Sequence, residues 1–148
     1  MTTAVKKRSF IAYIFLSMIT FGIYSIVFWT KLSKEVNTLC EGDGKKTMKY
    51  IYCYLLNIVT FGIFGFVWKY KLAERMRANA ARYNLSFSES GALVVVLALL
   101  TGPFLLAKFV LVKNFNALAV AYNEYNGLVM PKSIFDDEEE EAEAEVQA

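Results

Sequence analysis

The sequence contains no histidine, only two cysteines and only two prolines in 148 residues. Without histidine, the common mixed zinc sites and histidine-based acid–base catalysis are excluded. Cys40 and Cys53 have no metal-ligand spacing and give no disulfide framework. Cys53 is expected to pack as a small apolar side chain, and Cys40 fits the same interpretation. The carboxylates outside residues 136–148 do not pair on an apolar helix face, so we expect no enzyme, no metal and no cofactor.

Charge is also nearly missing from three long stretches, residues 10–30, 48–68 and 91–112, where Lys49 and Lys108 are the only charged residues. A helix of about 20 residues spans roughly 30 Å of hydrocarbon, so each stretch is long enough for a bilayer. Together with a composition that is 56% hydrophobic, this predicts an all-α integral membrane protein. The first stretch is too long for a signal-peptide core and has no small-residue cleavage site, so it predicts a retained anchor.

The small net charge of +2 conceals an acidic C-terminal end. Residues 136–148 hold eight of the fourteen acidic groups and no basic group, which leaves +10 on everything before them. We therefore divide the chain into a basic segment (1–9), a membrane domain (10–130) and an acidic tail (131–148). A run of like charge predicts a solvated, disordered tail. The alternative is a tail that folds back on the basic loops and competes with anionic lipid.

A pattern that returns about every forty residues organises the membrane domain. Residues 10–37 and 50–77 share nine identities, and a third copy keeps Gly102 in register. Each apolar stretch is broken near its centre, where glycine supplies backbone freedom, threonine can cap the following helix, and proline removes a donor. An amphipathic basic helix follows each break. The break residues are Thr20, Phe21, Gly22, Thr60, Phe61, Gly62, Gly102 and Pro103.

Basic side chains line the helices that follow the first two breaks. Anionic lipid headgroups are the expected ligands, because each nearby Lys or Arg contributes about 1 kcal/mol and the apolar stretches bring the chain to lipid. Nucleic acid is not expected as a partner. Trp29 and Trp68, near the ends of their stretches, fit interfacial anchoring. The headgroup candidates are Lys31, Lys34, Lys69, Lys71, Arg75, Arg77 and Arg82.

Asn57 and Lys108 are polar residues set inside the apolar stretches, where such residues are functional candidates. Structural roles are favoured for both: Asn57 is expected to bond across helices, and Lys108 can extend its ammonium toward the interface. Ser17 stands at the place equivalent to Asn57, which suggests a polar contact shared between repeats. The linker 42–47 fails the phosphate-loop pattern at two positions and predicts a flexible loop.

The topology has two interpretations. Basic residues occur at every connection, so the positive-inside rule selects no orientation for simple spans. The stretches are either kinked transmembrane helices or re-entrant helical hairpins whose tips are the breaks. The hairpin interpretation requires protein to shield the non-helical backbone at each tip.

The pattern of residues 20–32, Thr-Phe-Gly-Ile-Tyr with Trp29 and Lys31-Leu32, resembles the hallmark of the bacterial membrane family called domain of unknown function 4234. The linker 40–47, the segment 77–83 and the segment 113–119 are similar to it as well, so the resemblance covers residues 8–127. It implies a multi-pass protein of the bacterial cytoplasmic (inner) membrane and no activity. The chain departs from the pattern at Lys69, which stands where the first repeat has Trp29.

These observations predict an uncharacterised, non-enzymatic membrane protein with a structural, scaffolding or lipid-interacting role. Its expected partners are the phospholipid bilayer and anionic headgroups, and the interpretation leaves room for a homo-oligomer. The alternative is a small channel or transporter, because repeated broken helices also build substrate sites.

Overall fold

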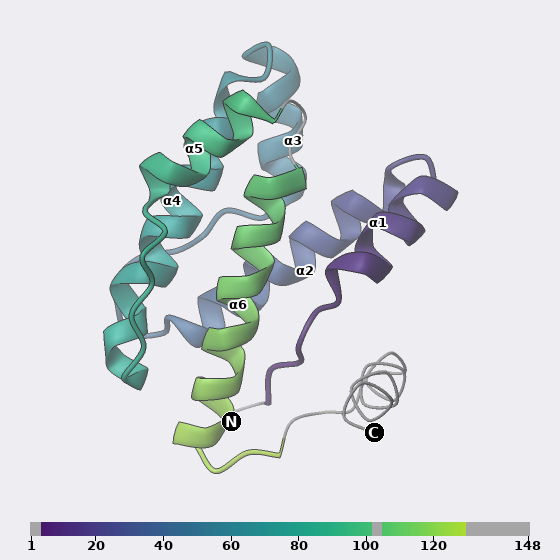
Figure 1. Cartoon of the computed structure of the whole chain (residues 1–148). Helices are drawn as coiled ribbons and strands as arrows, with labels where there is room; N and C mark the ends of the chain where they lie inside the picture. Colours follow the sequence, from purple (N-terminus) through teal and green to yellow (C-terminus); the bar gives the residue numbers. More distant parts are fainter. Residues whose placement is uncertain (1–3, 102–104, 130–148) are drawn as a thin grey trace, which may run out of the picture.

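The computed structural model describes residues 4–101 and 105–129, which form helices and contain no strand (Figure 1). The helices follow one another in pairs, one pair to each predicted repeat, so the all-α class is confirmed. The Gly102-Pro103 break and the acidic tail lie outside the described residues. The pairs are α1 (Phe10–Ile19) with α2 (Ile23–Leu39), α3 (Tyr50–Val59) with α4 (Ile63–Ala80), which the 3₁₀ turn η1 (Ala81–Tyr83) extends, and α5 (Gly91–Leu100) with α6 (Leu105–Tyr125).

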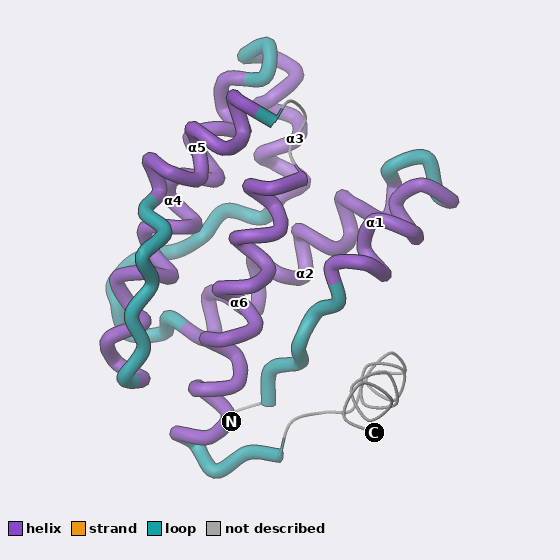
Figure 2. The backbone as a smooth tube through the Cα atoms, viewed as in Figure 1, coloured by secondary structure: helices purple, strands orange, loops and turns teal. Residues whose placement is uncertain are grey.

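Each pair is a helical hairpin, because its first helix packs against its second (Figure 2). At the first tip Gly22 adopts φ 90°, and its amide donates to the carbonyl of Ser17 at 2.8 Å. At the second tip Gly62 adopts φ 92° and donates to the carbonyl of Asn57 at 2.8 Å. A six-residue closure of this kind ends a helix at a left-handed glycine, so the break reverses the chain. Over the described residues, no helix combines the length and the apolar character needed to cross a membrane.

Threonine joins the two arms at each described tip. The Thr20 hydroxyl donates to the Leu16 carbonyl at 2.7 Å and accepts from the Tyr24 amide at 3.0 Å, so it serves the end of one helix and the start of the next. Thr60 does the same, at 2.8 and 3.1 Å. Each hydroxyl accepts an amide of the following helix, as predicted, but the N-cap residues of the second helices are Gly22 and Gly62 and not the threonines. Thr101, one place later in its repeat, keeps the first of these bonds with the Leu97 carbonyl, at 2.6 Å.

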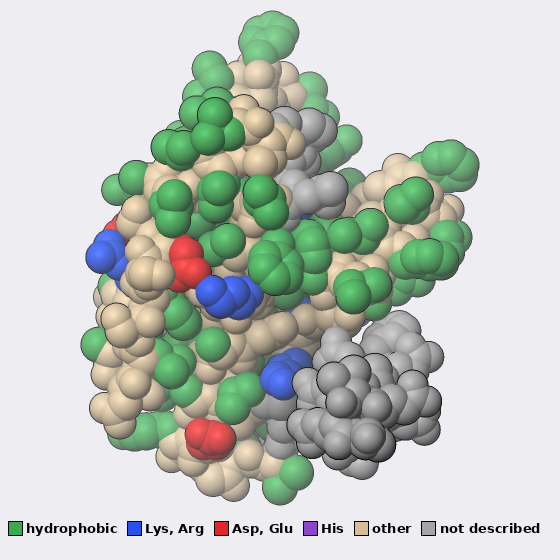
Figure 3. Space-filling model, viewed as in Figure 1, with side chains coloured by type: hydrophobic (Ala, Val, Ile, Leu, Met, Phe, Trp, Pro, Cys, Tyr) green, Lys and Arg blue, Asp and Glu red, His purple; other side chains and the backbone are tan. Residues whose placement is uncertain are grey.

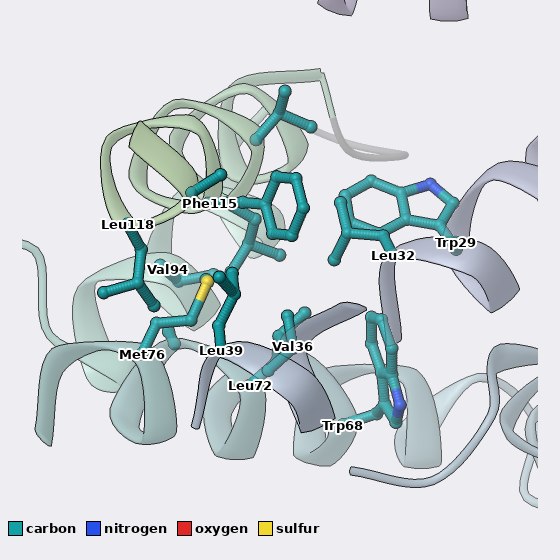
Figure 4. Close-up of a cluster of buried hydrophobic side chains, with 14 of the residues drawn as sticks. Trp29, Leu32, Val36, Leu39, Trp68, Leu72, Met76, Val94, Phe115 and Leu118 are labelled. Atoms are coloured by element: carbon teal, nitrogen blue, oxygen red, sulfur yellow. The ribbon is translucent and has the colours of Figure 1, made fainter. Parts of the chain in front are cut away.

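The core lies where the second helices of the hairpins meet, away from the tips (Figure 4). Its side chains recur at steps of three and four, as the amphipathic pattern predicts, and burying each large one contributes about 1.5–3 kcal/mol. The fully buried members include Leu32, Val36 and Leu39 from α2, Leu72 and Met76 from α4, and Leu111, Phe115 and Leu118 from α6.

Two asparagines of α6 bind the N-terminal segment along that helix. The Asn123 side chain accepts from the Val5 amide at 2.9 Å and donates to the Val5 carbonyl at 2.7 Å. Asn116, seven residues earlier on the same face, makes the same pair of bonds with Arg8, both at 2.7 Å. Arg8 also forms an ion pair with Glu35 of α2 at 2.7 Å. Residues 5–8 of the basic N-terminal segment are therefore part of the folded unit.

Candidate membrane-binding surface

Large apolar side chains cover the hairpins from their tips toward the core (Figure 3). Single exposed apolar residues are common on soluble proteins, whereas many large ones along the same hairpin arms are typical of an interaction site. Its exposed members include Ile11, Phe15, Met18, Ile19, Phe21, Ile23 and Val27 in the first hairpin, Tyr52, Leu55, Ile58, Val59, Phe61, Ile63 and Val67 in the second, and Leu93, Val96, Leu99, Leu100, Leu106 and Phe109 in the third.

A fully exposed phenylalanine stands at the tip of each of the first two hairpins. Phe21 and Phe61 are 98% and 97% exposed, and both adopt φ 52°, in the left-handed region. A left-handed conformation costs a bulky residue about 1–2 kcal/mol, whereas glycine, asparagine or aspartate adopts it more easily. Neither ring is buried in the fold, so folding does not explain a phenylalanine at both positions. An apolar phase outside the protein would explain it.

The first exposed lysine after each described tip lies at the same distance along its second helix. Lys31 follows Gly22 by nine residues, and Lys71 follows Gly62 by nine, a rise of about 14 Å in a helix. Both side chains are exposed. On α6, Lys113 is exposed and pairs with Glu89 at 2.6 Å, which lowers the pKa of Glu89 through that hydrogen bond. The surface thus changes from apolar to charged about 14 Å from the tips.

Two lysines lie nearer the tips, and both turn toward the protein. Lys69 is 6% exposed, and its ammonium donates to the Gly65 carbonyl at 3.4 Å. Lys108 donates to the Tyr13 hydroxyl at 2.9 Å, across from α6 to α1. That hydroxyl also contacts Ser25 at 2.9 Å and accepts from the Trp29 indole at 3.2 Å. The charges set among the apolar arms are therefore shielded by protein groups.

Asn57 bonds between the two arms of its own hairpin, as predicted for a bond across helices. Its side-chain oxygen accepts from the Gly65 amide at 2.8 Å. A Cβ atom at Gly65 would stand 2.8 Å from that oxygen, so a larger residue here would have to displace the Asn57 amide group. The expected shared contact at Ser17 is wrong: its buried hydroxyl has no hydrogen-bond partner among the residues described. In the first hairpin the Tyr13–Ser25 contact joins the arms instead.

Arg75 lies in a buried ion-pair network and holds the linker between the first two hairpins. Its guanidinium binds both carboxylate oxygens of Asp43, at 2.8 and 3.0 Å, and donates to the Lys45 carbonyl at 2.6 Å and the Thr47 hydroxyl at 2.8 Å. Its hydrogen bonds hold the pKa of the Asp43 carboxyl well below its usual range. The prediction of a flexible linker is therefore wrong, because hydrogen bonds from Arg75 hold the linker against α4. Arg75 thus has a structural role.

The other headgroup candidates separate by exposure. Lys31, Lys34, Lys71, Arg77 and Arg82 are exposed, whereas Lys69 and Arg75 are buried. The exposed residues come from α2 (Lys31, Lys34), from α4 (Lys71, Arg77) and from the turn η1 (Arg82).

The interpretation of Trp29 and Trp68 as interfacial anchors is wrong. They are 1% and 4% exposed, and their rings pack edge to face with centroids 6.0 Å apart. The Trp68 indole donates to the Met48 carbonyl at 3.2 Å. Both rings pack in the core between the first two hairpins, so neither ring is exposed at the protein surface. Cys40 and Cys53 are buried free thiols, as expected, and burial raises the pKa of Cys40 to about 11.

Over the described residues, these features define a small all-helical protein of three packed helical hairpins, the first two with exposed apolar tips. The chain belongs to the family described as a domain of unknown function, DUF4234, which matches residues 8–78 and again residues 51–120. The two overlapping matches take in the first and second hairpins, and the second and third, in keeping with the internal repeat. The same comparisons match the chain to no curated protein and to no solved structure.

Proposed function

We propose that this chain is a non-enzymatic membrane protein that inserts its hairpins, tips first, into one leaflet of a bilayer and shapes or scaffolds that surface. The observation that carries the proposal is the pair of fully exposed phenylalanines, Phe21 and Phe61, held at the tips in a backbone conformation unfavourable to them. Burying two such rings in hydrocarbon contributes about 3–6 kcal/mol.

The spacing of charge supports insertion to the depth of one leaflet. The hydrocarbon core of a bilayer is about 30 Å thick, so one leaflet provides about 15 Å. The exposed lysines Lys31 and Lys71 stand about 14 Å from the tips, which places them at headgroup level when the tips reach the midplane. Lys69 and Lys108 would lie below that level, and both bond to protein groups there. Buried ionisable groups in membranes face the protein interior for the same reason.

Vesicle flotation tests insertion. Phe21→Asn and Phe61→Asn together keep the charge and suit the left-handed turn, while removing both rings. The double variant should bind zwitterionic phosphatidylcholine vesicles at least about 100-fold more weakly than the parent chain, given 1.4 kcal/mol per tenfold change. The matched control changes Tyr125 and Val129, which are 72% and 89% exposed at the opposite end, to Asn. Tip insertion would be contradicted if the two double variants lost vesicle binding equally. It would also be contradicted if neither of them lost binding.

Labelling of single cysteines distinguishes hairpins from spans. In a background with Cys40 and Cys53 replaced by alanine, cysteine is placed at Glu41 and, separately, at Ser86, both exposed between hairpins. Re-entrant hairpins predict that an impermeant maleimide modifies both positions from the same side of the membrane. Modification from opposite sides would establish transmembrane spans, and ion or solute flux through vesicles containing the protein would favour the channel alternative.

The acidic tail is proposed to weaken binding to anionic membranes by repelling them. Deletion of residues 136–148, which removes eight negative charges, should strengthen binding to phosphatidylglycerol vesicles in low salt. The gain should shrink as salt rises. Binding that ignores both salt and the tail would remove the electrostatic part of the proposal.

A further inference from the structure

A groove of about 600 Å³ runs between α4 and the linker that leads into α3. One wall is a stripe of α4, where Phe64, Trp68, Lys71 and Arg75 follow one another at helical steps. The other wall is the chain from Lys45 to Met48. The volume is in the range of sites that hold small ligands.

The two ends of the groove differ in chemistry. The end toward the hairpin tip is apolar, with Phe64, Trp68 and Met48, and it continues into the exposed arm of the second hairpin. The end toward the linker carries the exposed lysines Lys45, Lys46 and Lys71. An elongated site with apolar and cationic ends matches an amphiphile that has an acyl chain and an anionic head.

The linker wall is fixed in place by two independent sets of hydrogen bonds. Arg75 holds the Lys45 carbonyl at 2.6 Å and the Thr47 hydroxyl at 2.8 Å, and the Trp68 indole holds the Met48 carbonyl at 3.2 Å. The backbone that carries Lys45 and Lys46 is thus ordered before any ligand arrives. A pre-organised site loses less conformational entropy on binding.

The charge balance at the linker end favours an anion. Within the described part of the chain, no carboxylate lies in ion-pair distance of the Lys45, Lys46 or Lys71 ammonium groups. Glu74 also lines the groove, but its carboxylate accepts from the Gly91 amide at 2.6 Å and lies 3.8 Å from Arg77. Arg75 is neutralised by Asp43.

We propose that this groove binds one anionic phospholipid, its phosphate on Lys45, Lys46 and Lys71 and one acyl chain over Phe64 and Trp68. This proposal rests on the insertion of the hairpins, because the apolar end opens toward the same arm that would enter the leaflet. Lysine is a point-charge ligand for phosphate and needs no fixed fork geometry, so three exposed lysines suit a headgroup of variable orientation.

The test uses the full chain in a neutral detergent, titrated with phosphatidylglycerol whose acyl chains carry bromine. It follows quenching of the tryptophan fluorescence, which comes from Trp68 in the groove wall and from Trp29 in the core. The groove variant is Lys45→Gln/Lys46→Gln/Lys71→Gln. The matched control is Lys6→Gln/Lys7→Gln/Lys113→Gln, which removes the same charge from lysines outside the groove. The groove variant should bind at least about tenfold more weakly, and the control within about threefold of the parent chain.

Several outcomes would overturn the proposal. They are equal weakening in both triple variants, equal quenching by brominated phosphatidylcholine, or competition by glycerol phosphate as strong as that by unbrominated phosphatidylglycerol. The last of these would mean that the site takes a free phosphate ester and not a lipid. Met48→Gln, at a half-exposed position of the apolar end, should weaken binding of the lipid but not of glycerol phosphate.

Flotation of the same variants on phosphatidylcholine vesicles separates this proposal from membrane insertion. The groove variant keeps every tip residue and should float like the parent chain. Loss of lipid quenching with normal flotation supports the groove, whereas normal quenching in the groove variant overturns it and leaves insertion standing. Failure of the parent chain to float would overturn insertion itself.

Discussion

The contact between Arg75 and Asp43 makes a sharp prediction about stability. Both side chains are nearly buried, at 6% and 12% exposed, and the guanidinium also binds Lys45 and Thr47. Arg75→Met keeps much of the volume but leaves the Asp43 carboxylate without its counter-ion. Breaking a buried pair in this way costs about 3–5 kcal/mol. We therefore expect the free energy of unfolding to fall by that amount.

A double-mutant cycle isolates the pair. Arg75→Met, Asp43→Asn and the double variant are unfolded by urea in neutral detergent, with helix content and tryptophan fluorescence as independent probes. The coupling energy should be about 1–3 kcal/mol, so the double variant is more stable than the sum of the single losses implies. Lys31→Met, an exposed basic residue on α2, is the control and should change stability by less than about 0.5 kcal/mol. A loss below about 1 kcal/mol for Arg75→Met, or an additive cycle, would refute a structural role for this arginine.

Asp43 should also make the fold sensitive to acid, because the pKa of its carboxyl is lower in the folded chain than in the unfolded chain. The unfolded chain therefore binds more protons, and the free energy of unfolding falls as pH drops below about 4. Acid titration of Asp43→Asn should show that this loss is removed. Gly65→Ala should cost about 1–3 kcal/mol, because the new Cβ meets Asn57, and the cost measured by urea unfolding should shrink when Asn57→Ala is added. Asn123→Ala should remove two hydrogen bonds, lower stability by about 1–3 kcal/mol and speed hydrogen exchange in the N-terminal segment; unchanged exchange would contradict the clamp. Cys40 is buried with a pKa of about 11, so at pH 8 its modification by maleimide should track unfolding, and rapid labelling of the folded chain would disprove that burial.

Much of the fold follows from local patterns in the sequence. The forty-residue repeat places the breaks, and steps of three and four mark the buried faces of α2, α4 and α6 correctly. These features are local because a helix is stabilised by bonds between near neighbours, and its buried face is visible in its own periodicity. The Thr20 and Thr60 hydroxyls are equally local, since they bridge helices only three residues apart.

The errors and omissions concern contacts between distant segments. Trp68 lies beside Trp29 because two hairpins pack together, and neither periodicity nor position reveals that pairing. Arg75 belongs to the same basic stripe as Lys71, yet a single turn of helix takes it from the surface into the Asp43 network. The hydrogen bonds between Asn123 and Val5 join residues that are 118 positions apart in the sequence. Only information on both residues of a pair, such as covariation of the two positions among related sequences, would have predicted these contacts.

The repeat and the tips together give a reason for the duplication. The first arm of each hairpin is only ten residues long, and isolated helices of that length are marginal in water. Joining three copies creates a core from the second helices, which lets the two described tips remain apolar and exposed without loss of the fold. The same joining brings Lys108 of the third hairpin to the Tyr13 hydroxyl of the first. The buried core thus lies among the second helices and the apolar exposure at the two described tips, the division that the proposed insertion into a lipid phase requires.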